Sequence, residues 1–477
     1  MRGALVIVLV ALAGCGTEGE ASLDAAPDSI LDASVEDATA ADADAASDAD
    51  LPTPDVPLPP DAVDHDPDPE VVHVRLRAAP REFVVRGETV SGFAYNEVNP
   101  APTIRARRGS RVIIDVDNQL EAPTTIHWHG LHVPFDMDGV VWMGAPIGAG
   151  ETFRYEFVVS QQAGTYWYHP HFDTERQVDL GLYGAFVIED PVEPASDLDA
   201  VVFFDSWGEA PGTSGHTGHR DGTHLTWTAN NVAEGALRVA AGSVVRLRLL
   251  NASNAGYLNI SGQGMRAIGA SQGLLPADRE WRERELLVPG DRRDFEVRVG
   301  SEAVEIRTAP HTLHGGAGHG DERVLFRIEP TGEAELPSGL DWPSPEIRPS
   351  VDPSYTDILY SFQGDTDLER WFINGERFPD VTIEEVPLDS VQIIELRNVS
   401  PAEHPFHMHG HGFEILSIND VPVSTYSFVD TFNLPVRSRV RIRLIADNPG
   451  DWMTHCHILP HAYDGMMTVL RVLAASP

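Results

Sequence analysis

From Val71 onward, short β-type runs of apolar residues alternate with Gly, Pro, Asn and Asp. Runs of this kind, with no long amphipathic helix between them, predict an all-β chain of sandwiches or barrels. They fall into three sets, which are Val71 to Leu76, Glu82 to Val85, Arg111 to Val116, Phe153 to Val159 and Ala185 to Ile188; Val201 to Phe204, Val244 to Leu250 and Phe295 to Val299; and Val391 to Leu396, Phe413 to Ile418, Val440 to Ile445, Trp452 to His457 and Met467 to Val472.

The three sets predict three consecutive β-sandwich domains. A chain of 477 residues is also too long for one ordinary core. We place the domains at residues 71–190, 191–330 and 351–477. The Pro-rich stretch at 331–350 is predicted to be a linker.

The first residues are typical of a processing signal. Arg2 precedes an apolar run from Ala4 to Ala13 that is too short to span a bilayer. The run ends in Leu12-Ala13-Gly14-Cys15, which resembles a bacterial lipobox, so residues 1–15 are predicted to be a lipoprotein signal with lipid on Cys15. Gly16 then favours the outer membrane of the cell envelope. The alternative is an ordinary secretory signal with a chance cysteine.

Residues 16–70 are rich in Asp, Ala and Pro and carry 17 acidic and no basic side chains. Such a composition cannot bury enough apolar surface to offset chain entropy, so we predict a disordered tether. The formal net charge of the chain is −39, and most of the excess lies outside this segment. This charge argues against nucleic-acid binding and is compatible with cationic or metal partners, although solubility alone would explain it.

The second of the two cysteines, Cys456, lies between two histidines in a run that is predicted to be a strand. Alternation along a strand sends Cys456 to one face and His455 and His457 to the other, so this tripeptide can reach two metal centres. His461 and Met466 follow at spacings of five, in a predicted loop. A thiolate, imidazoles and a thioether are the ligands of a blue copper site.

Half of the 20 histidines fall into four compact groups, in which each His-X-His pair presents both imidazoles to one face of a strand. A structural zinc site is the alternative, but it needs only about four ligands, and eight paired imidazoles beside a cysteine exceed that need and favour copper. The groups are His127-Trp-His129, His169-Pro-His171, His404-Pro-Phe-His407-Met-His409, and His455-Cys456-His457 with His461.

In order and spacing these four groups resemble the four copper signatures of multicopper oxidases, over about residues 71 to 477. The resemblance implies cupredoxin-like Greek-key domains, a middle domain without copper, and four copper ions per chain. It implies type 1 copper at Cys456, His404 and His461 with axial Met466, and type 2 copper at His127 and His407. It implies a type 3 pair at His129, His169, His171, His409, His455 and His457.

The resemblance also implies an oxidase of laccase type. Single electrons from a phenol-like donor would enter through an exposed edge of His404 or His461 and pass from Cys456 to His455 and His457. Dioxygen would be reduced to water at a three-copper cluster between the first and third domains. Asp138 matches a carboxylate of bacterial relatives that serves proton transfer, although it could be only a turn residue before Gly139.

The sequence departs from bacterial relatives at Ala462, where a glutamate commonly follows the last type 1 histidine. Asp464 is nearby, but nothing in the sequence shows that it substitutes. His132 and His411 are interpreted as neighbours of ligands rather than ligands. Histidines in two Gly-rich middle-domain segments could recruit copper, but we favour mobile surface loops; they are His216, His219, His224, His311, His314 and His319.

Other functions remain as alternatives. A cuprous ion oxidase for copper tolerance is weakened by the small number of methionines, which is 8 in the whole chain. A copper-binding envelope protein, or a scaffold that has lost its metals, would be expected to lack some ligands. A two-domain nitrite reductase would need fewer histidines. We expect a monomer that contacts the membrane only through the lipid on Cys15.

Overall fold

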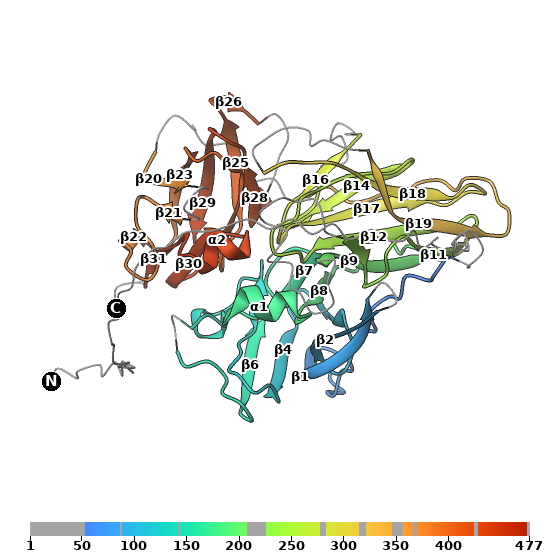
Figure 1. Cartoon of the computed structure of the whole chain (residues 1–477), viewed down its shortest axis with the longest axis horizontal. Coiled ribbons are helices and arrows are strands. Elements are labelled where there is room, and N and C mark those ends of the chain that lie inside the picture. The colour runs from blue at the N-terminus through green and yellow to red at the C-terminus, as the bar shows by residue number, and fades with distance from the viewer. Residues whose placement is uncertain are drawn as a thin grey trace, which may run out of the picture. The chain divides into compact units, whose positions relative to one another are not determined.

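The computed structural model describes residues 53–85, 88–141, 144–207, 226–276, 283–313, 321–345, 356–365, 370–423 and 428–474. Within these residues the strands form six sheets, two from each of three successive stretches of chain (Figure 1). The predicted signal, Cys15 and most of the predicted tether lie outside the described residues. In the described part of the chain, no helix is both long and apolar enough to cross a membrane.

The first stretch forms two four-stranded sheets. The predicted runs Val71 to Leu76 and Glu82 to Val85 are one continuous strand, because Pro80 lies where the strand pairs only with β2 and its missing N–H costs no ladder bond. In sheet order the strands are β2 (Glu88–Tyr95), β1 (Val71–Val85), β4 (Arg111–Asn118) and β6 (Thr152–Val158), and then β3 (Ala101–Arg107), β8 (Gly184–Glu189), β7 (Gly164–His169) and β5 (His127–His129).

The second stretch forms a six-stranded and a five-stranded sheet. The six-stranded sheet has the order β10 (Thr226–Ala229), β9 (Leu198–Trp207), β12 (Val244–Asn251), β17 (Arg292–Arg298), β14 (Met265–Ala270) and β15 (Gly273–Leu274). The five-stranded sheet has the order β11 (Gly235–Ala240), β19 (Arg323–Thr331), β18 (Val304–Ala309), β13 (Leu258–Ser261) and β16 (Glu285–Leu287).

The third stretch forms a seven-stranded and a five-stranded sheet. The first of these contains β21 (Arg370–Ile373), β20 (Ile358–Asp365), β23 (Ser390–Asn398), β29 (Arg439–Ala446), β25 (Phe413–Ile418) and β26 (Val421–Pro422), with β27 (Phe428–Val429) beside β25. The second has the order β22 (Glu384–Pro387), β31 (Met467–Leu473), β30 (Gly450–Cys456), β24 (His404–Met408) and β28 (Thr431–Leu434).

The same strand topology recurs in each stretch. β1, β9 and β20 each pair antiparallel with the next strand and parallel with a later one, β4, β12 and β23 respectively. The pairs β3 and β8, β11 and β19, and β22 and β31 are likewise parallel. Each stretch also has its own cluster of buried apolar side chains. The chain is therefore built from three repeats of one sandwich topology.

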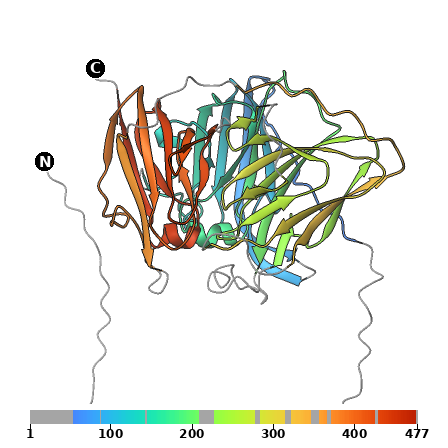
Figure 2. The same cartoon turned by 90° about the horizontal axis from the view of Figure 1, so that it is seen from above.

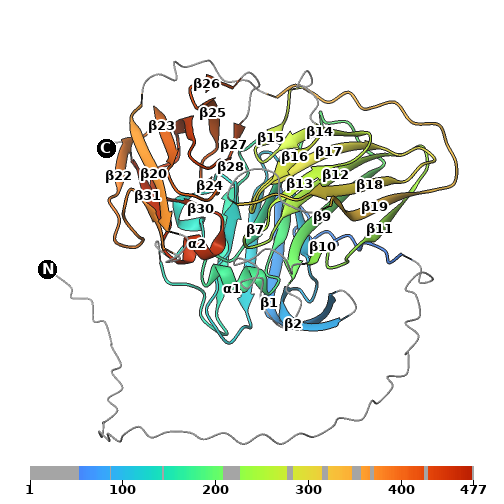
Figure 3. The same ribbon diagram turned by 45° about the horizontal axis from the view of Figure 1, so that its top comes forward.

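Two short helices lie side by side, as Figure 1, Figure 2 and Figure 3 all show. They are α1 (Thr174–Asp179) and α2 (Leu459–Tyr463). A 3-10 turn, η2 (Phe135–Met137), follows β5. The segment that carries His461 is thus a helix and not the predicted loop. Pro460 stands in the first turn of α2, where the fixed φ of proline favours a helix start.

Residues 53–70 pack onto the sheets, so the predicted disordered tether is wrong for this part. The Val56 N–H donates to the Ala236 carbonyl, and the Ala62 N–H donates to the Thr103 carbonyl, both at 2.8 Å. Val56 is buried in the apolar core of the second stretch. Composition could not reveal this, because it does not show that open strand edges at β11 and β3 pair with the segment's backbone in addition to the burial of Val56.

The part of the predicted linker that is described, residues 331–345, is extended chain packed on the second stretch. Trp342 is buried, and its indole N–H donates to Glu296 at 2.8 Å. The Arg246 guanidinium lies 5.0 Å from the centre of the Trp342 ring. This segment is therefore anchored to the middle sandwich.

Candidate metal centres

The four histidine groups lie on two pairs of adjacent strands. β5 pairs with β7 so that His127 is opposite His169, and β24 pairs with β30 so that His407 is opposite His455. Directly opposed residues of antiparallel strands bring their side chains to the same face, about 5 Å apart. Groups that are distant in sequence therefore meet in pairs.

Eight buried histidines gather in one place, which we call the histidine cluster. Its two halves come from the first and third stretches, as predicted, and face each other. The His129 and His407 rings stack with centroids 3.7 Å apart and planes at 9°, and His127 stacks on His409 at 3.8 Å and 24°. The members are His127, His129, His169, His171, His407, His409, His455 and His457.

Several sets of nitrogens in the histidine cluster are close enough to share a metal ion. The ligand atoms of each set lie within 4.8 Å of one another. The all-histidine sets are His127 with His129 and His169, His127 with His407 and His409, and His171 with His409 and His455.

Hydrogen bonds decide which nitrogen each imidazole presents to the centre. In five of the histidines Nδ1 lies 2.8 to 3.1 Å from an oxygen, so Nδ1 carries the proton and Nε2 the lone pair. The Nε2 atoms of His409 and His455 lie 3.1 Å apart. Among the described residues no partner satisfies the buried Nε2 of His127, His169 or His407. Lone pairs that converge without a proton donor fit a bound cation.

Burial keeps seven of these imidazoles neutral. It lowers the pKa of His455 to about 4, and it moves the pKa well below the usual value for a further set of members. That set is His129, His169, His171, His407, His409 and His457. Neutral imidazole is the form that binds metal, so the site is ready for metal without first losing protons.

The second centre, which we call the Cys456 site, consists of Cys456, His404 and His461. The Cys456 Sγ lies 3.5 Å from Nδ1 of each histidine, and the two Nδ1 atoms are 3.2 Å apart. The centre of such a triangle is about 2 Å from each corner, close to the length of a metal–histidine bond. The predicted alternation is confirmed, because Cys456 joins this site while His455 joins the histidine cluster.

Met466 is fully buried, and its backbone is tied to the Cys456 site. Its N–H donates to the His461 carbonyl at 2.9 Å, and its carbonyl accepts from the Cys456 N–H at 3.2 Å. Met466 also belongs to the apolar cluster that contains Cys456. Burial in this apolar setting raises the pKa of the Cys456 thiol far above its usual value.

The expected exposed histidine edge at this site is wrong. His404 and His461 are 0% and 1% exposed. Trp371 of β21 stacks on His461 with ring centroids 3.7 Å apart, and the Ser400 hydroxyl lies 2.7 Å from His404 Nε2. Sequence spacing indicated the candidate ligands but not the residue that covers them, because Trp371 comes from a strand that is distant in sequence.

Asp138 contacts the histidine cluster directly. One carboxylate oxygen accepts from His409 Nδ1 at 2.8 Å, and the other lies 3.3 Å from His127 Nδ1. Asp138 also ends the η2 turn, so it occupies the predicted turn position before Gly139. Gly139 makes the approach possible, because it has a φ of +76° and a Cβ there would lie 1.8 Å from the Ile126 carbonyl oxygen.

Asp464 does not face the histidine cluster. Its carboxylate accepts from the Trp371 N–H at 2.9 Å and pairs with Arg377. Ala462 lies buried on α2, where the relatives' glutamate would stand. The position therefore has no carboxylate of its own, and Asp464 does not replace it.

Asp430 and Arg292 lie at the histidine cluster, and no sequence signal predicted either of them. Asp430, just before β28, lies 3.2 Å from His129 Nε2, and its oxygen completes a possible ligand set with His129 and His407. Arg292 of β17 forms a two-point ion pair with Asp430. No motif links positions so far apart, and only the packing of the second stretch against the third joins them.

The other histidines that are described belong to neither centre. His411 Nδ1 lies 3.3 Å from the His409 carbonyl, and His132 pairs with Asp447 at 3.3 Å, as expected for residues that are not ligands. His311 is not a mobile surface residue, because it stacks on Tyr257 and pairs with Glu403 at 2.9 Å. His216, His219, His224, His314 and His319 lie outside the described residues.

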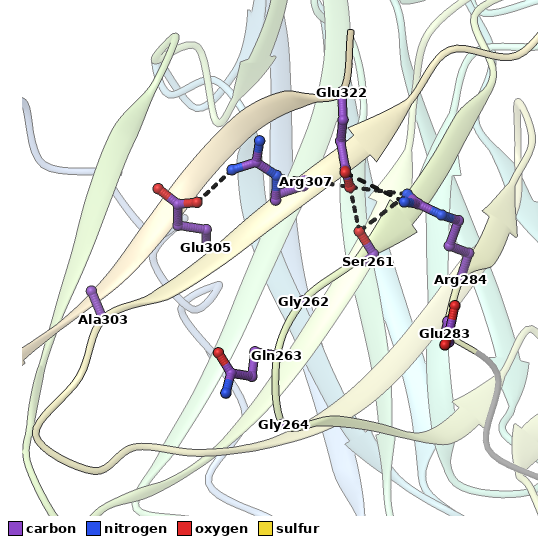
Figure 4. Close-up of a pocket in the computed structure, with 10 residues that line it drawn as sticks. All are labelled: Ser261, Gly262, Gln263, Gly264, Glu283, Arg284, Ala303, Glu305, Arg307 and Glu322. Atoms are coloured by element: carbon purple, nitrogen blue, oxygen red, sulfur yellow. Dashed lines mark hydrogen bonds and ion pairs between the residues drawn. The ribbon is translucent and has the colours of Figure 1, made fainter.

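A pocket of about 550 Å³ in the second stretch shares no residue with either centre. Figure 4 shows Arg284 and Ser261 both directed at Glu322, and Arg307 directed at Glu305. The Arg284 guanidinium lies 2.9 Å from Glu322. Because these charged groups satisfy one another, the pocket offers little to a charged ligand.

Comparisons with known proteins agree with this geometry. Two family models, both described as multicopper oxidase, match residues 79–193 and 350–476. Multicopper oxidase MmcO of Mycobacterium tuberculosis is 28% identical over 84% of this chain and 86% of its own. A laccase of Pycnoporus cinnabarinus is 28% identical over 80% of this chain and 86% of its own.

Among solved structures, a multicopper oxidase of Campylobacter jejuni, described as a metallo-oxidase, superposes with a TM-score of 0.77 at 26% identity. The match covers 89% of this chain and 96% of that one. The three repeated sandwiches are thus cupredoxin-like domains. The two matched segments carry all the histidines of both centres, so the chain belongs to the multicopper oxidase family and is a copper-dependent oxidase that uses dioxygen.

Proposed function

We propose that the Cys456 site takes single electrons from a phenol-like donor and that the histidine cluster uses them to reduce dioxygen to water. The observation that carries this proposal is the position of Cys456. Its side chain belongs to one centre, while its two peptide neighbours, His455 and His457, belong to the other. Its carbonyl also accepts from His455 Nδ1 at 2.9 Å. Covalent and hydrogen-bonded paths therefore join the centres.

The donor atoms fit copper. Cys456, His404 and His461 would hold type 1 copper, with Met466 as the axial ligand, and His127 and His407 would hold type 2 copper. The six other members of the histidine cluster would hold the type 3 pair. Bound copper supplies one-electron redox chemistry at the first site and a surface for dioxygen reduction at the second. The set of His171, His409 and His455 supports the assignment of one type 3 ion.

The protein's own residues orient the ligands and supply protons. Asp138 holds His127 and His409 with their Nε2 atoms toward the centre. Its second carboxylate oxygen is buried and lacks a hydrogen-bond partner among the described residues. A carboxylate in this position can pass a proton toward dioxygen, which consumes protons as it is reduced. We assign that role to Asp138.

The donor class rests on the surroundings of His461. Trp371 is 6% exposed and stacked on that ring, which gives an aromatic donor a flat neighbour through which to transfer an electron. Oxidation of cuprous ion is the second candidate. It is favoured by Glu403, the peptide neighbour of His404, which pairs with His311, and by the relative described as a metallo-oxidase.

The experiment compares copper-reconstituted wild type with Cys456→Ser, which removes the thiolate. Wild type should be blue and consume oxygen with a phenolic donor, and the variant should lose colour and turnover together. Oxygen uptake with cuprous ion, measured in parallel, separates the two donors. Rapid phenol oxidation without added copper would exclude the cuprous role, and a colourless but fully copper-loaded wild type would refute the copper assignment.

We further infer that Cys15 carries lipid and that the enzyme is a monomer at the outer membrane of the cell envelope. The lipobox-like sequence before Cys15 supports the anchor. Mass spectrometry of the N-terminal peptide from the native host tests it, since an unmodified or differently cleaved terminus would contradict the lipid. Light scattering of a variant that begins at residue 16 tests the monomer.

A further inference from the structure

Arg292 connects all three stretches of the chain at the histidine cluster. It opens β17 in the second stretch and is 1% exposed. Its Nε donates to the Thr165 carbonyl of the first stretch at 3.1 Å. Both of its terminal nitrogens donate to Asp430 of the third stretch at 2.7 Å. This two-point geometry fixes the orientation of the Asp430 carboxylate, not only its charge.

The Asp430 carboxylate is fully occupied by donors. Besides Arg292, one oxygen accepts from the Thr431 hydroxyl at 2.8 Å, and the other accepts from Gln272 at 2.6 Å. The carboxylate is 0% exposed. A buried charge is tolerated when it is paired and hydrogen-bonded in this way.

The orientation of Asp430 determines the orientation of His129. His129 Nε2 lies 3.0 Å from the Thr431 hydroxyl oxygen and 3.2 Å from Asp430. Since the Thr431 hydrogen is donated to Asp430, its oxygen accepts from His129 Nε2. That nitrogen therefore carries the proton. His129 Nδ1 is left buried with no partner in the described part of the chain, so it faces the centre.

His129 is thus reversed relative to the five cluster histidines that hold Nδ1 against an oxygen. This reversed orientation of His129 depends on close contact between segments of the three stretches. Gly130 has a φ of +84°, and a Cβ at this position would lie 2.5 Å from Asp430 and 2.6 Å from Arg292. The backbone beside His129 therefore leaves room for this ion pair.

We propose that Arg292 is a positioning residue of the copper cluster: by clamping Asp430 it makes His129 present Nδ1 instead of Nε2. The middle domain, which holds none of the copper ligands, would then still set the geometry of the cluster. This inference rests on the proposed copper ligation of His129. The step involves only orientation and hydrogen bonding, so no change of protonation is needed.

The test compares Arg292→Gln and Arg292→Lys with Arg248→Gln in the full, copper-reconstituted chain. Arg248 is the matched control, because it is equally buried and donates to Asp294 and Thr165 at the same junction without touching a histidine. The measurements are copper per chain, the blue absorbance of the Cys456 site, and the electron paramagnetic resonance spectrum of copper in the histidine cluster.

We expect Arg292→Gln to keep the blue absorbance, to change the resonance spectrum and to weaken copper retention in the histidine cluster by about tenfold to a hundredfold. Arg292→Lys keeps the positive charge but loses the two-point hydrogen bonding to Asp430. Its spectrum and its copper retention should therefore lie between those of Arg292→Gln and wild type. Arg248→Gln should match wild type in all three measurements.

A wild-type spectrum in Arg292→Gln, or an equal change in Arg248→Gln, would overturn the proposal. If Arg292→Gln does not fold, Arg292→Lys tests the proposal, since a wild-type spectrum in that variant would show that the two-point hydrogen bonding to Asp430 is not needed. Failure of wild type itself to take copper into the histidine cluster would instead contradict the proposed function.

Discussion

The Cys456 site and the histidine cluster are joined through one tripeptide, yet their surroundings differ. Around the Cys456 site, a backbone N–H of Ile458 points at the sulfur, a Ser400 hydroxyl meets His404, and Trp371 covers His461. Around the histidine cluster stand two buried carboxylates, those of Asp138 and Asp430.

The difference follows from what each centre must move. An electron needs only orbital overlap and a dry, rigid path, which buried apolar and aromatic side chains provide. Reduction of dioxygen also consumes protons and gathers charge, so that centre needs groups that exchange protons or fix dipoles. Asp138 has a buried oxygen without a hydrogen-bond partner in the described chain and suits the first task, whereas Asp430, clamped by Arg292, suits the second.

The substitution with the largest expected effect on this difference between the centres is Asp138→Asn. The amide can still accept from His409 but cannot deliver a proton, so oxygen turnover should fall by about a hundredfold or more. Reduction of the Cys456 site by the donor should keep its wild-type rate, because that step moves no proton at Asp138. Stopped-flow bleaching of the blue colour and steady-state oxygen uptake measure the two steps separately.

Asp464→Asn is the matched control, since Asp464 is the nearest carboxylate in sequence to the missing glutamate but pairs with Arg377. It should leave both rates near wild type. A large loss of turnover in this variant, with Asp138→Asn unaffected, would place proton delivery at Asp464 instead of Asp138. It would contradict the assignment of proton transfer to the surroundings of the histidine cluster.

Two substitutions that each remove a hydroxyl test the difference between the centres, with a smaller expected effect on metal binding. Ser400→Ala removes the partner of His404 Nε2, and Thr431→Val removes the partner of His129 Nε2. Loss of such an outer hydrogen bond typically weakens metal binding by about tenfold. Ser400→Ala should affect only the blue absorbance and Thr431→Val only the copper of the histidine cluster.

Copper retention under a competing chelator, followed by absorbance and by resonance, measures both effects. The two variants serve as controls for each other because each deletes one hydroxyl at one centre: that of Ser400 lies beside His404, and that of Thr431 lies beside His129 and His407. Equal losses at both centres in either variant would show that the centres form one mechanical unit and would remove the basis for treating them separately.

The residues that gather at the two centres were predictable from the sequence, because the spacing of metal-ligating residues along a strand is a local pattern. The His-X-His pairs and the run from His455 to His457 carry their geometry in strand alternation, so Cys456 and His455 were sent to different centres correctly. The β pattern likewise predicted an all-β fold. The structure differs in that two predicted runs form the single strand β1, and in the short helices α1 and α2, the second of which carries His461.

The surroundings of the ligands were not predictable, because they depend on contacts between distant segments. Arg292 reaches Asp430 across 138 positions, and Trp371 covers His461 from another strand. The prediction of disorder for residues 53–70 failed for a similar reason, since an acidic segment with few apolar residues can still add its backbone to an open strand edge. Local patterns specify ligands, and packing between domains specifies what holds and covers them.

The smallest expected difference between the centres concerns protons: only the Cys456 site should release a proton when copper binds. Burial raises the pKa of the Cys456 thiol, so the metal-free protein holds this proton at pH 7 and must lose it when a metal binds. Burial lowers the pKa of His404 to about 3 and of His455 to about 4, so these imidazoles are already neutral. Loading with copper should therefore release about one proton per chain near pH 7.

Calorimetry in two buffers of different ionisation enthalpy measures this release, and Cys456→Ser is the control that should release almost none. The sign follows from the thiol: copper binding at the Cys456 site should tighten as pH rises, while binding at the histidine cluster should stay flat above the lowered histidine pKa values. Release of several protons would mean that the cluster histidines are charged before metal binds. The contrast between a Cys456 site that releases one proton and a histidine cluster that releases none would then fail.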